Sequence, residues 1–352
     1  MILLNPGPVT MTAKVHAALN GADVCHREPE FRELVGAIRT KIAAIYGAPG
    51  YTPVLVGGSG TAAVETMLAV VSTSDNSLVV ANGVYGERMA AMLRAQSKRH
   101  EVVSAPWTSG MDLAATEKAL ATGAFQFVLA VHHETTTGRL NDIAALGALC
   151  KKHGAKLLLD AVSSFAGEEL HFAEWNLEAL AATANKCIHG APGVSFVLVA
   201  DEALKRPGGA TSVYLDLHKH AAEQAKGSTP FTLPTHVSFA LDAALDELAA
   251  EGGWKARHAT YAQRMGRVRA ALKEIGVTTL IEEAAYGSTL CSFRLPEGKT
   301  YDALHAQLKR DGFVIYAGQG KFDGAIFRIA VMGEISERDL ERLATSLRSA
   351  LG

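Results

Sequence analysis

Short apolar runs that end in polar or glycine-rich turns recur along the first two hundred residues of the chain. These runs span residues 53–56, 78–81, 101–104, 125–131, 157–159 and 194–199. Stretches with apolar residues at helical spacing lie between them, for example residues 62–68 and 113–120. Buried strands that alternate with helices form mostly parallel sheets that are covered on both faces. The pattern therefore predicts an α/β fold with a mostly parallel sheet.

The pattern changes near residue 250, where Glu251, Gly252 and Gly253 interrupt a helical stretch that begins at His236. Between residues 206 and 235 the periodicity is weak. Beyond the interruption the sequence predicts a helix over 254–275, strands near 277–281, 290–295, 313–316 and 326–330, and a last helix capped by Ser336. We expect a large α/β domain over residues 15–250 and a smaller α+β domain over residues 251–352, which also holds the N-terminal arm, residues 1–14.

Charge and cysteine usage exclude several classes of partner and site. The 352 residues include 34 Lys and Arg against 36 Asp and Glu, without a run of like charges, so neither nucleic acid nor an anionic membrane is an expected partner. The four cysteines are far apart and form no CxxC pair, which argues against a metal site and a disulfide framework. No segment approaches the roughly 20 apolar residues of a membrane span, and no signal peptide is evident. We expect a cytoplasmic protein.

Asp160 and Lys186 are the candidate catalytic pair. Asp160 ends the apolar run Leu157–Leu159, which would deliver its carboxylate to the edge of the sheet where ligands bind. Lys186 follows a run of small residues, so poor solvation would lower its pKa toward the range in which a neutral amine attacks a carbonyl. Such a pair suits pyridoxal phosphate, because the carboxylate can hold the pyridine nitrogen protonated and the lysine can hold the aldehyde. A helix-capping aspartate and a solvated surface lysine are the plain alternatives.

A glycine-rich turn follows the apolar run over residues 53–56. The turn contains Gly58, Ser59, Gly60 and Thr61 and leads directly into a helix. Free backbone amides and the positive end of the helix would surround a phosphate there, with two hydroxyls as extra donors. A Rossmann dinucleotide site is disfavoured because the third glycine is missing at Val64 and its neighbours. A bare tight turn remains the alternative.

Two more polar segments follow predicted strands. Tyr85 stands between Gly83 and Gly86 and could stack on a flat ring or fill the core. Thr135 lies in a polar segment where it could bond a ligand hydroxyl or cap a turn. The two histidines before it lack HExxH spacing, so zinc is a poor explanation and no metal site is expected.

Three further segments each permit two interpretations. The arm around Asn5 and Gly7 is rich in proline and glycine, and it could bring its backbone close to a ligand or be a plain extended arm. Arg27 could anchor a substrate anion, but pairing with Glu28 or Glu30 is favoured by the sequence alone. Arg328 lies inside an apolar strand, where its planar fork would bind a carboxylate or another oxyanion, or form an internal ion pair.

Together these segments resemble the fold-type I pyridoxal phosphate enzymes of the class V aminotransferase group. The resemblance extends over nearly the whole chain. Within the group, the chain resembles more specifically the members that use 2-aminoethylphosphonate. It rests on residues 4–8, Cys25-His26-Arg27-Glu28 with Glu30-Phe31, residues 58–62, Asn82-Gly83-Val84-Tyr85-Gly86, residues 133–138 and Ala184-Asn185-Lys186-Cys187.

The resemblance implies a role for each matching position. Lys186 would bind the cofactor covalently and carry the proton, and Asp160 would contact the ring nitrogen. The other implied cofactor contacts are stacking by Tyr85, a phosphate cradle of Ser59, Gly60 and Thr61, and a ring-hydroxyl contact from Thr135. Thr232 matches a phosphate contact that comes from the partner subunit, which implies a homodimer with a shared active site.

The implied reaction moves the amino group of 2-aminoethylphosphonate to pyruvate, in phosphonate catabolism, and yields phosphonoacetaldehyde and L-alanine. Arg328 would bind the carboxylate, while Asn5, Gly7 and Arg27 lie in segments distinctive of the phosphonate-using members. Tyr85 replaces the tryptophan of some glyoxylate-using relatives, which favours the phosphonate. An alanine– or serine–glyoxylate transaminase is the alternative within the group. A non-catalytic nucleotide-binding α/β protein is the alternative outside it.

Overall fold

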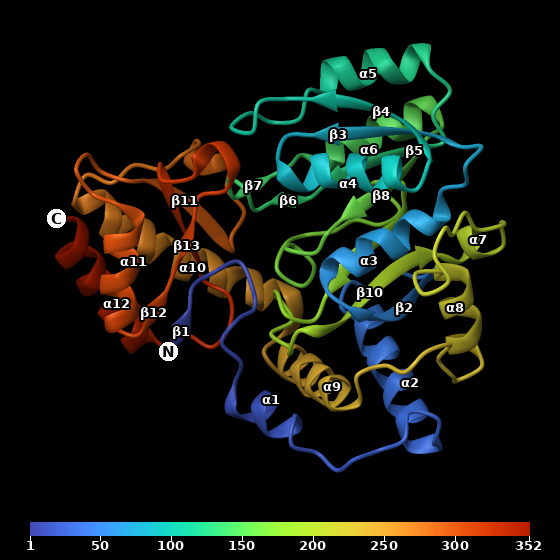
Figure 1. Ribbon diagram of the computed structural model, residues 1–352, viewed down its shortest axis with the longest axis horizontal. Helices are drawn as coiled ribbons and strands as arrows, with labels where there is room; N and C mark the ends of the chain where they lie inside the picture. The colour runs from blue at the N-terminus through green and yellow to red at the C-terminus, as the bar shows by residue number, and fades with distance from the viewer.

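The computed structural model describes residues 1–352 and shows a seven-stranded sheet flanked by helices, with a smaller α+β part beside it (Figure 1). The strands of the large sheet are β2 (Tyr51–Gly58), β3 (Asn76–Ala81), β4 (Arg99–Ser104), β5 (Phe127–Val131), β8 (Lys156–Asp160), β9 (Leu177–Thr183) and β10 (Gly193–Ala200). Their order is β2-β10-β9-β8-β5-β3-β4, and only β10 runs antiparallel to its neighbours. The mostly parallel α/β fold predicted from the sequence is confirmed.

Helices cover both faces of this sheet. They are α1 (Ala13–Ala18), α2 (Pro29–Ala44), α3 (Gly60–Met67), α4 (Val84–Ala95), α5 (Leu113–Thr122), α6 (Ile143–His153), α7 (Asp201–Leu204), α8 (Leu217–Ala225) and α9 (Thr235–Ala250). Neighbouring strand residues belong to different cores: Val54 to the core that contains residues of α3, α4 and α8, and Leu55 to the core that contains residues of α2, α6 and α9. The central strands are buried on both faces and are therefore nearly continuous apolar runs, whereas the edge strand β4 is largely exposed.

The C-terminal part is built on an antiparallel sheet of order β11-β14-β13. Its elements are α10 (Gly253–Glu274), β11 (Leu290–Arg294), α11 (Tyr301–Arg310), β12 (Phe313–Val314), β13 (Tyr316–Ala317), β14 (Ile326–Ala330) and α12 (Glu337–Leu351). The first strand of the chain, β1 (Ile2–Leu3), pairs in parallel with β12. The arm therefore begins on the C-terminal part and then runs toward α1 (Figure 1). The division into domains at residue 250 stays a prediction.

One expectation for an individual element is wrong. No strand forms over residues 277–281, where Thr279 makes only an isolated bridge to Phe293. Backbone pairing with β11 is limited to this bridge, with the Leu280 amide donating to the Ser292 carbonyl at 2.9 Å, and the Tyr286 hydroxyl accepts from the amides of Leu280 and Ile281 at 3.1 and 3.2 Å. Helix α8 lies within the stretch of weak periodicity. Its signal was Asp216, whose side chain caps the helix by accepting from the Lys219 amide.

The short elements complete the description of the chain. They are β6 (His133–Glu134), β7 (Arg139–Leu140) and the 3-10 turns Leu68–Val70, Glu283–Ala285 and Gly320–Phe322. As expected, the Ser336 side chain caps α12 and forms a capping box with Asp339. No helix of the chain combines the length and the apolarity that a membrane crossing requires.

A buried carboxylate joins the large sheet to the C-terminal part. Glu168, in the turn after β8, accepts from the Ser288 amide at 2.6 Å and pairs with His258 of α10 at 3.2 Å. Burial alone would raise the pKa of Glu168, but the hydrogen bonds from His258 and Ser288 hold it below its ordinary value. The same bond to Glu168 raises the pKa of His258 to about 9. His258 is therefore protonated at neutral pH and stabilises the contact between the two parts.

Replacing His258 with Gln should weaken the fold in a pH-dependent way. The folded-state pKa of about 9 exceeds the unfolded value of roughly 6.5, so the contribution is complete below the unfolded pKa and is lost as the pH rises through about 9. Because the side chain is partly exposed, we expect a loss of only about 1 kcal/mol in the free energy of unfolding near pH 6. Urea unfolding near pH 6 and above pH 9 measures it. His171→Gln, at a surface ion pair, is the control, and an equal loss at both pH values would contradict the interpretation.

Candidate active site

Candidate residues from five strands meet at one edge of the large sheet. Ser59 follows β2, Tyr85 follows β3 and Thr135 follows β5, while Asp160 ends β8 and Lys186 follows β9. All five strands run in the same direction, so their carboxyl ends lie at the same edge. Ligands of open α/β sheets bind at this edge.

Asp160 is 6% exposed and has one free oxygen. Its Oδ1 accepts from the Val162 amide at 2.9 Å, and its Oδ2 has no partner within the chain. Burial raises the pKa of Asp160 to about 6, although the Val162 amide and the charges of Lys186 and Arg88 oppose the rise. The free oxygen can accept one strong hydrogen bond from a cationic N–H group.

Lys186 lies in a closed turn beyond β9, where the N-terminal arm covers it. Its Nζ donates to the Pro6 carbonyl. A Cβ added to Gly7 would lie 2.7 Å from Lys186 Cδ, and Gly7 has a positive φ of 116°, so only glycine fits there. Asn5 is buried and its Nδ2 donates to the Pro8 carbonyl at 3.0 Å, which closes the arm over the lysine. Burial lowers the pKa of Lys186 to about 8.

Side chains of α10 hold the turn that carries Lys186 in place. The buried Arg257 donates to the carbonyls of Cys187 and Ile188, at 2.8 and 3.2 Å, and forms an ion pair with Glu251. His189 has a positive φ of 68°, and its Nε2 contacts the Tyr261 hydroxyl at 2.6 Å. Arg257 was not among the candidate residues from the sequence, where its signal is an arginine on the otherwise apolar face of a long helix.

The glycine-rich turn presents free donors at the start of α3. Ser59 is the N-cap residue, but its side chain does not cap the helix, and the amides of Gly60 and Thr61 have no hydrogen-bond partner within the chain. A Cβ on Gly60 would lie 2.7 Å from Val162 Cγ1, so the absence of a side chain lets the helix start approach the Asp160 loop. The turn has the free amides and the dipole of an anion site.

Tyr85 and Asp160 line one small cavity. Its lining also includes Gly60, Thr61, Arg88 and Val162. The Arg88 guanidinium lies 4.7 Å from the centre of the Tyr85 ring. Arg88 was not among the residues selected from the sequence, where it is one of two arginines on an amphipathic helix.

Arg328 comes from β14 of the C-terminal part and is 1% exposed. Its Nε donates to the Ala317 carbonyl and its Nη1 to the Thr135 carbonyl, both at 2.8 Å. Its Nη2 is buried without a partner, and no carboxylate lies within ion-pair distance. Burial lowers the pKa of Arg328. The internal ion pair that the sequence left open is therefore absent, and Nη2 can bind an anion beside Thr135.

Thr232 and Arg27 are not joined to these residues within one chain. Thr232 is exposed and contacts His26 Nε2 at 3.4 Å. Arg27 is exposed and makes no side-chain hydrogen bond. Neither has a hydrogen bond or an ion pair to another candidate residue.

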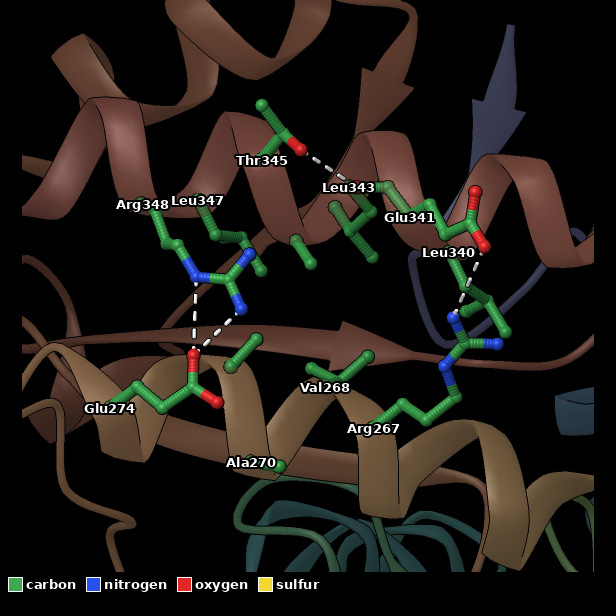
Figure 2. A pocket seen from close by; sticks show the side chains of 12 residues that line it. Arg267, Val268, Ala270, Glu274, Leu340, Glu341, Leu343, Thr345, Leu347 and Arg348 are labelled. Carbon is green, nitrogen blue, oxygen red and sulfur yellow. Dashed lines mark hydrogen bonds and ion pairs between the residues drawn. The ribbon is translucent and has the colours of Figure 1, made fainter.

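A separate groove of about 450 Å³ lies between α10 and α12 (Figure 2). Val268, Leu340 and Leu343 are among its apolar residues, and Arg348 pairs with Glu274 across it at 2.7 Å. The groove contains none of the candidate residues, so it is not part of the sheet-edge site.

Comparisons with known proteins agree with this geometry. Residues 10–330 match the model of the class-V aminotransferase family. The 2-aminoethylphosphonate–pyruvate transaminases of Vibrio vulnificus (strain CMCP6) and Salmonella typhimurium (strain LT2) are 38% and 35% identical to this chain; each alignment covers 99% of this chain and 97% of the relative.

Solved structures show the same architecture. An alanine–glyoxylate aminotransferase from Nostoc sp. superposes with a TM-score of 0.93 at 25% identity, covering 100% of this chain and 95% of that one. An aspartate aminotransferase from Thermus thermophilus superposes with a TM-score of 0.91 at 25% identity, covering 100% and 99%. The fold-type I architecture, the sheet-edge residues and the family match together show that this chain belongs to the class-V aminotransferases.

Proposed function

We propose that this enzyme transfers the amino group of 2-aminoethylphosphonate to pyruvate in a ping-pong reaction that gives phosphonoacetaldehyde and L-alanine. Relatives with this name are similar over almost the whole chain. The observation that carries the proposal is the buried, unpartnered Nη2 of Arg328 at the same edge as Lys186 and Asp160. Both half-reactions need an anion-binding group beside the reacting amine, because each substrate carries a phosphonate or a carboxylate.

Pyridoxal phosphate is the cofactor of this family, and the residues of the site fit it. The edge offers a buried amine, a carboxyl group with one free oxygen and a helix start with free amides. When bound, pyridoxal phosphate supplies an aldehyde that takes up amines and a ring that withdraws electrons from the carbon that loses its proton.

Lys186 and Asp160 would have separate tasks. Lys186 Nζ would hold the aldehyde, be released by the incoming amine, and then move the proton between the two carbons that exchange it. Its pKa of about 8 leaves a useful fraction of the amine neutral. The free oxygen of Asp160 would accept from the protonated ring nitrogen, and that positive charge would hold the carboxyl ionised despite its burial.

The remaining residues would orient the cofactor and the substrate. Ser59, Gly60 and Thr61 would bind the phosphate, Tyr85 would stack on the ring, and Thr135 would contact the ring hydroxyl. Arg328 would bind the carboxylate of the keto acid, and the arm at Asn5 and Gly7 would exclude water from Lys186.

A dimer would complete the site. Thr232 and Arg27 are exposed and have no hydrogen bond to the candidate residues of their own chain. We propose that Thr232 contacts the cofactor phosphate of the partner subunit and that Arg27 belongs to the phosphonate site. Analytical ultracentrifugation of the purified protein tests whether it forms a dimer.

The cytoplasmic location also stays a prediction.

The donor decides between the proposed activity and its alternatives. Adding 2-aminoethylphosphonate to the purified holoenzyme should convert the cofactor to its amine form, seen as a loss of the visible absorbance band, and pyruvate should restore the band. Serine and glyoxylate are the controls. If serine converts the cofactor and 2-aminoethylphosphonate does not, the enzyme is a glyoxylate transaminase instead. A colourless protein that binds no pyridoxal phosphate would point to a non-catalytic nucleotide-binding protein.

Replacing Lys186 with Ala should abolish turnover and the absorbance of covalently bound cofactor. Borohydride reduction of the native holoenzyme should attach the cofactor to Lys186, as peptide mass spectrometry would show. Lys98 is an internal control, because burial also lowers its pKa to about 8 while its Nζ donates to the Leu68 carbonyl. A label on Lys98, or a Lys186→Ala protein that keeps the absorbance, would contradict the assignment.

Replacing Arg328 with Gln should raise the KM for pyruvate by roughly 30-fold or more, because a charge-assisted hydrogen bond to a carboxylate is worth about 2–3 kcal/mol. Cofactor binding should change much less. Arg267→Gln, at a surface ion pair with Glu337, is the matched control and should leave KM as it is. A KM for the Arg328→Gln enzyme equal to that of the native enzyme would remove Arg328 from the substrate site.

A further inference from the structure

The helix that carries Tyr85 is capped by another segment of the chain. Gly83 is the N-cap residue of α4 and has no side chain with which to cap it. Instead, Thr136 Oγ1 accepts from the Val84 amide and Glu134 Oε2 accepts from the Tyr85 amide, both at 3.2 Å. The first two amides of α4 are therefore bound by side chains from the turn that follows β5.

Glu134 is the centre of this contact. It is 0% exposed, and its Oε1 accepts from the amide of Thr136 at 3.1 Å and from the Thr136 hydroxyl at 2.5 Å. Burial raises the pKa of Glu134, and the hydrogen bonds from Thr136 and Tyr85 oppose the rise. The positive end of the α4 dipole also favours an anion at this position. A Cβ on Gly83 would lie 2.2 Å from Glu134 Cδ, so the carboxylate packs directly against the helix start.

The same carboxylate holds the turn that contains Thr135. Thr135 lies between Glu134 and Thr136, and its carbonyl accepts from Arg328 Nη1 at 2.8 Å. The proposed ring-stacking residue, the ring-hydroxyl contact and the anion-binding arginine are thus connected through one buried side chain. Both Glu134 oxygens are engaged within the protein, because Oε1 accepts from two donors and Oε2 from one.

We propose that Glu134 is a positioning residue that sets the placement of the Tyr85 ring relative to Thr135, and so orients the bound cofactor. It acts through Tyr85 and touches neither cofactor nor substrate. The inference rests on the proposed function, in which Tyr85 stacks on the cofactor ring. A small displacement of a positioning group can cost much in binding and rate, because the reacting geometry must be held closely.

Glu134→Gln tests the proposal with little change in volume. An amide cannot accept with both ends, so one N–H of the cluster must lose its acceptor. The variant should fold, bind pyridoxal phosphate about tenfold more weakly, and give an altered visible circular dichroism per bound cofactor. Glu87→Gln is the matched control: Glu87 is also on the first turn of α4 but accepts from the Trp107 indole at 2.7 Å. Its dissociation constant and visible spectrum should match those of the native protein.

A double-mutant cycle separates positioning from a purely structural role. If Glu134 acts through the Tyr85 ring, Glu134→Gln should weaken cofactor binding much less in a Tyr85→Leu background than in the native one. Equal effects in both backgrounds, or a Glu134→Gln protein with only a lower melting temperature and the native spectrum, would overturn the inference. If Tyr85→Leu alone leaves cofactor binding unchanged, the proposed role of Tyr85 fails and this inference fails with it. If only Glu134→Gln is without effect, the proposed function stands.

Should Glu134→Gln not fold, Thr136→Val provides the measurement. It removes the hydroxyl that holds Glu134 Oε1 and the Val84 amide, while the bond from Tyr85 to Glu134 remains possible. We expect a change of the same sign and smaller size in the dissociation constant and the visible spectrum. Native values for both would overturn the proposal.

Discussion

This site depends on one constraint: the Lys186 amine and the Asp160 carboxyl group are both buried, away from water, at one edge of the sheet. Burial lowers the pKa of Lys186 and raises that of Asp160. The charge of each group opposes the shift in the pKa of the other. An exposed pair would keep ordinary pKa values and would lack this reactivity. The large sheet makes the burial possible, because its parallel strands are covered on both faces and bring their polar ends to a common edge.

Much of the structure around this edge supplies hydrogen-bond partners to the backbone of loops. Arg257 binds the carbonyls beside Lys186, and Glu134 binds the amides at the start of α4. Both are fully buried charges with several partners, as buried charges need to be. Arg328 is the exception, because one of its nitrogens is left without a partner. A buried donor in that condition is costly to stability, and a ligand anion repays the cost.

The fold and many of the candidate residues could be predicted because their signals are local. An apolar run ending in Asp160, a glycine-rich turn before α3 and an arginine within a strand are each visible in a few neighbouring residues. Arg257 and Glu134 were assigned no role, because their function depends on loops about 70 and 50 positions away along the chain. Residues 277–281 have the composition of a strand, but their pairing with β11 ends after one bridge, and the Ile281 amide donates to the Tyr286 hydroxyl, a contact that a sequence pattern does not reveal. The roles proposed for Thr232 and Arg27 stay predictions, because neither side chain has a hydrogen bond to another candidate residue of its own chain.

The pairing of β1 with β12 has a consequence for the newly made protein. Ile2 aligns with Phe313, and the arm that follows β1 covers Lys186 with the carbonyl of Pro6. Synthesis runs toward the C-terminal end, so the β1 segment is made long before residue 313 and has no strand partner until the β12 segment follows. The pairing that anchors the arm over Lys186 can therefore form only after β12 has been made.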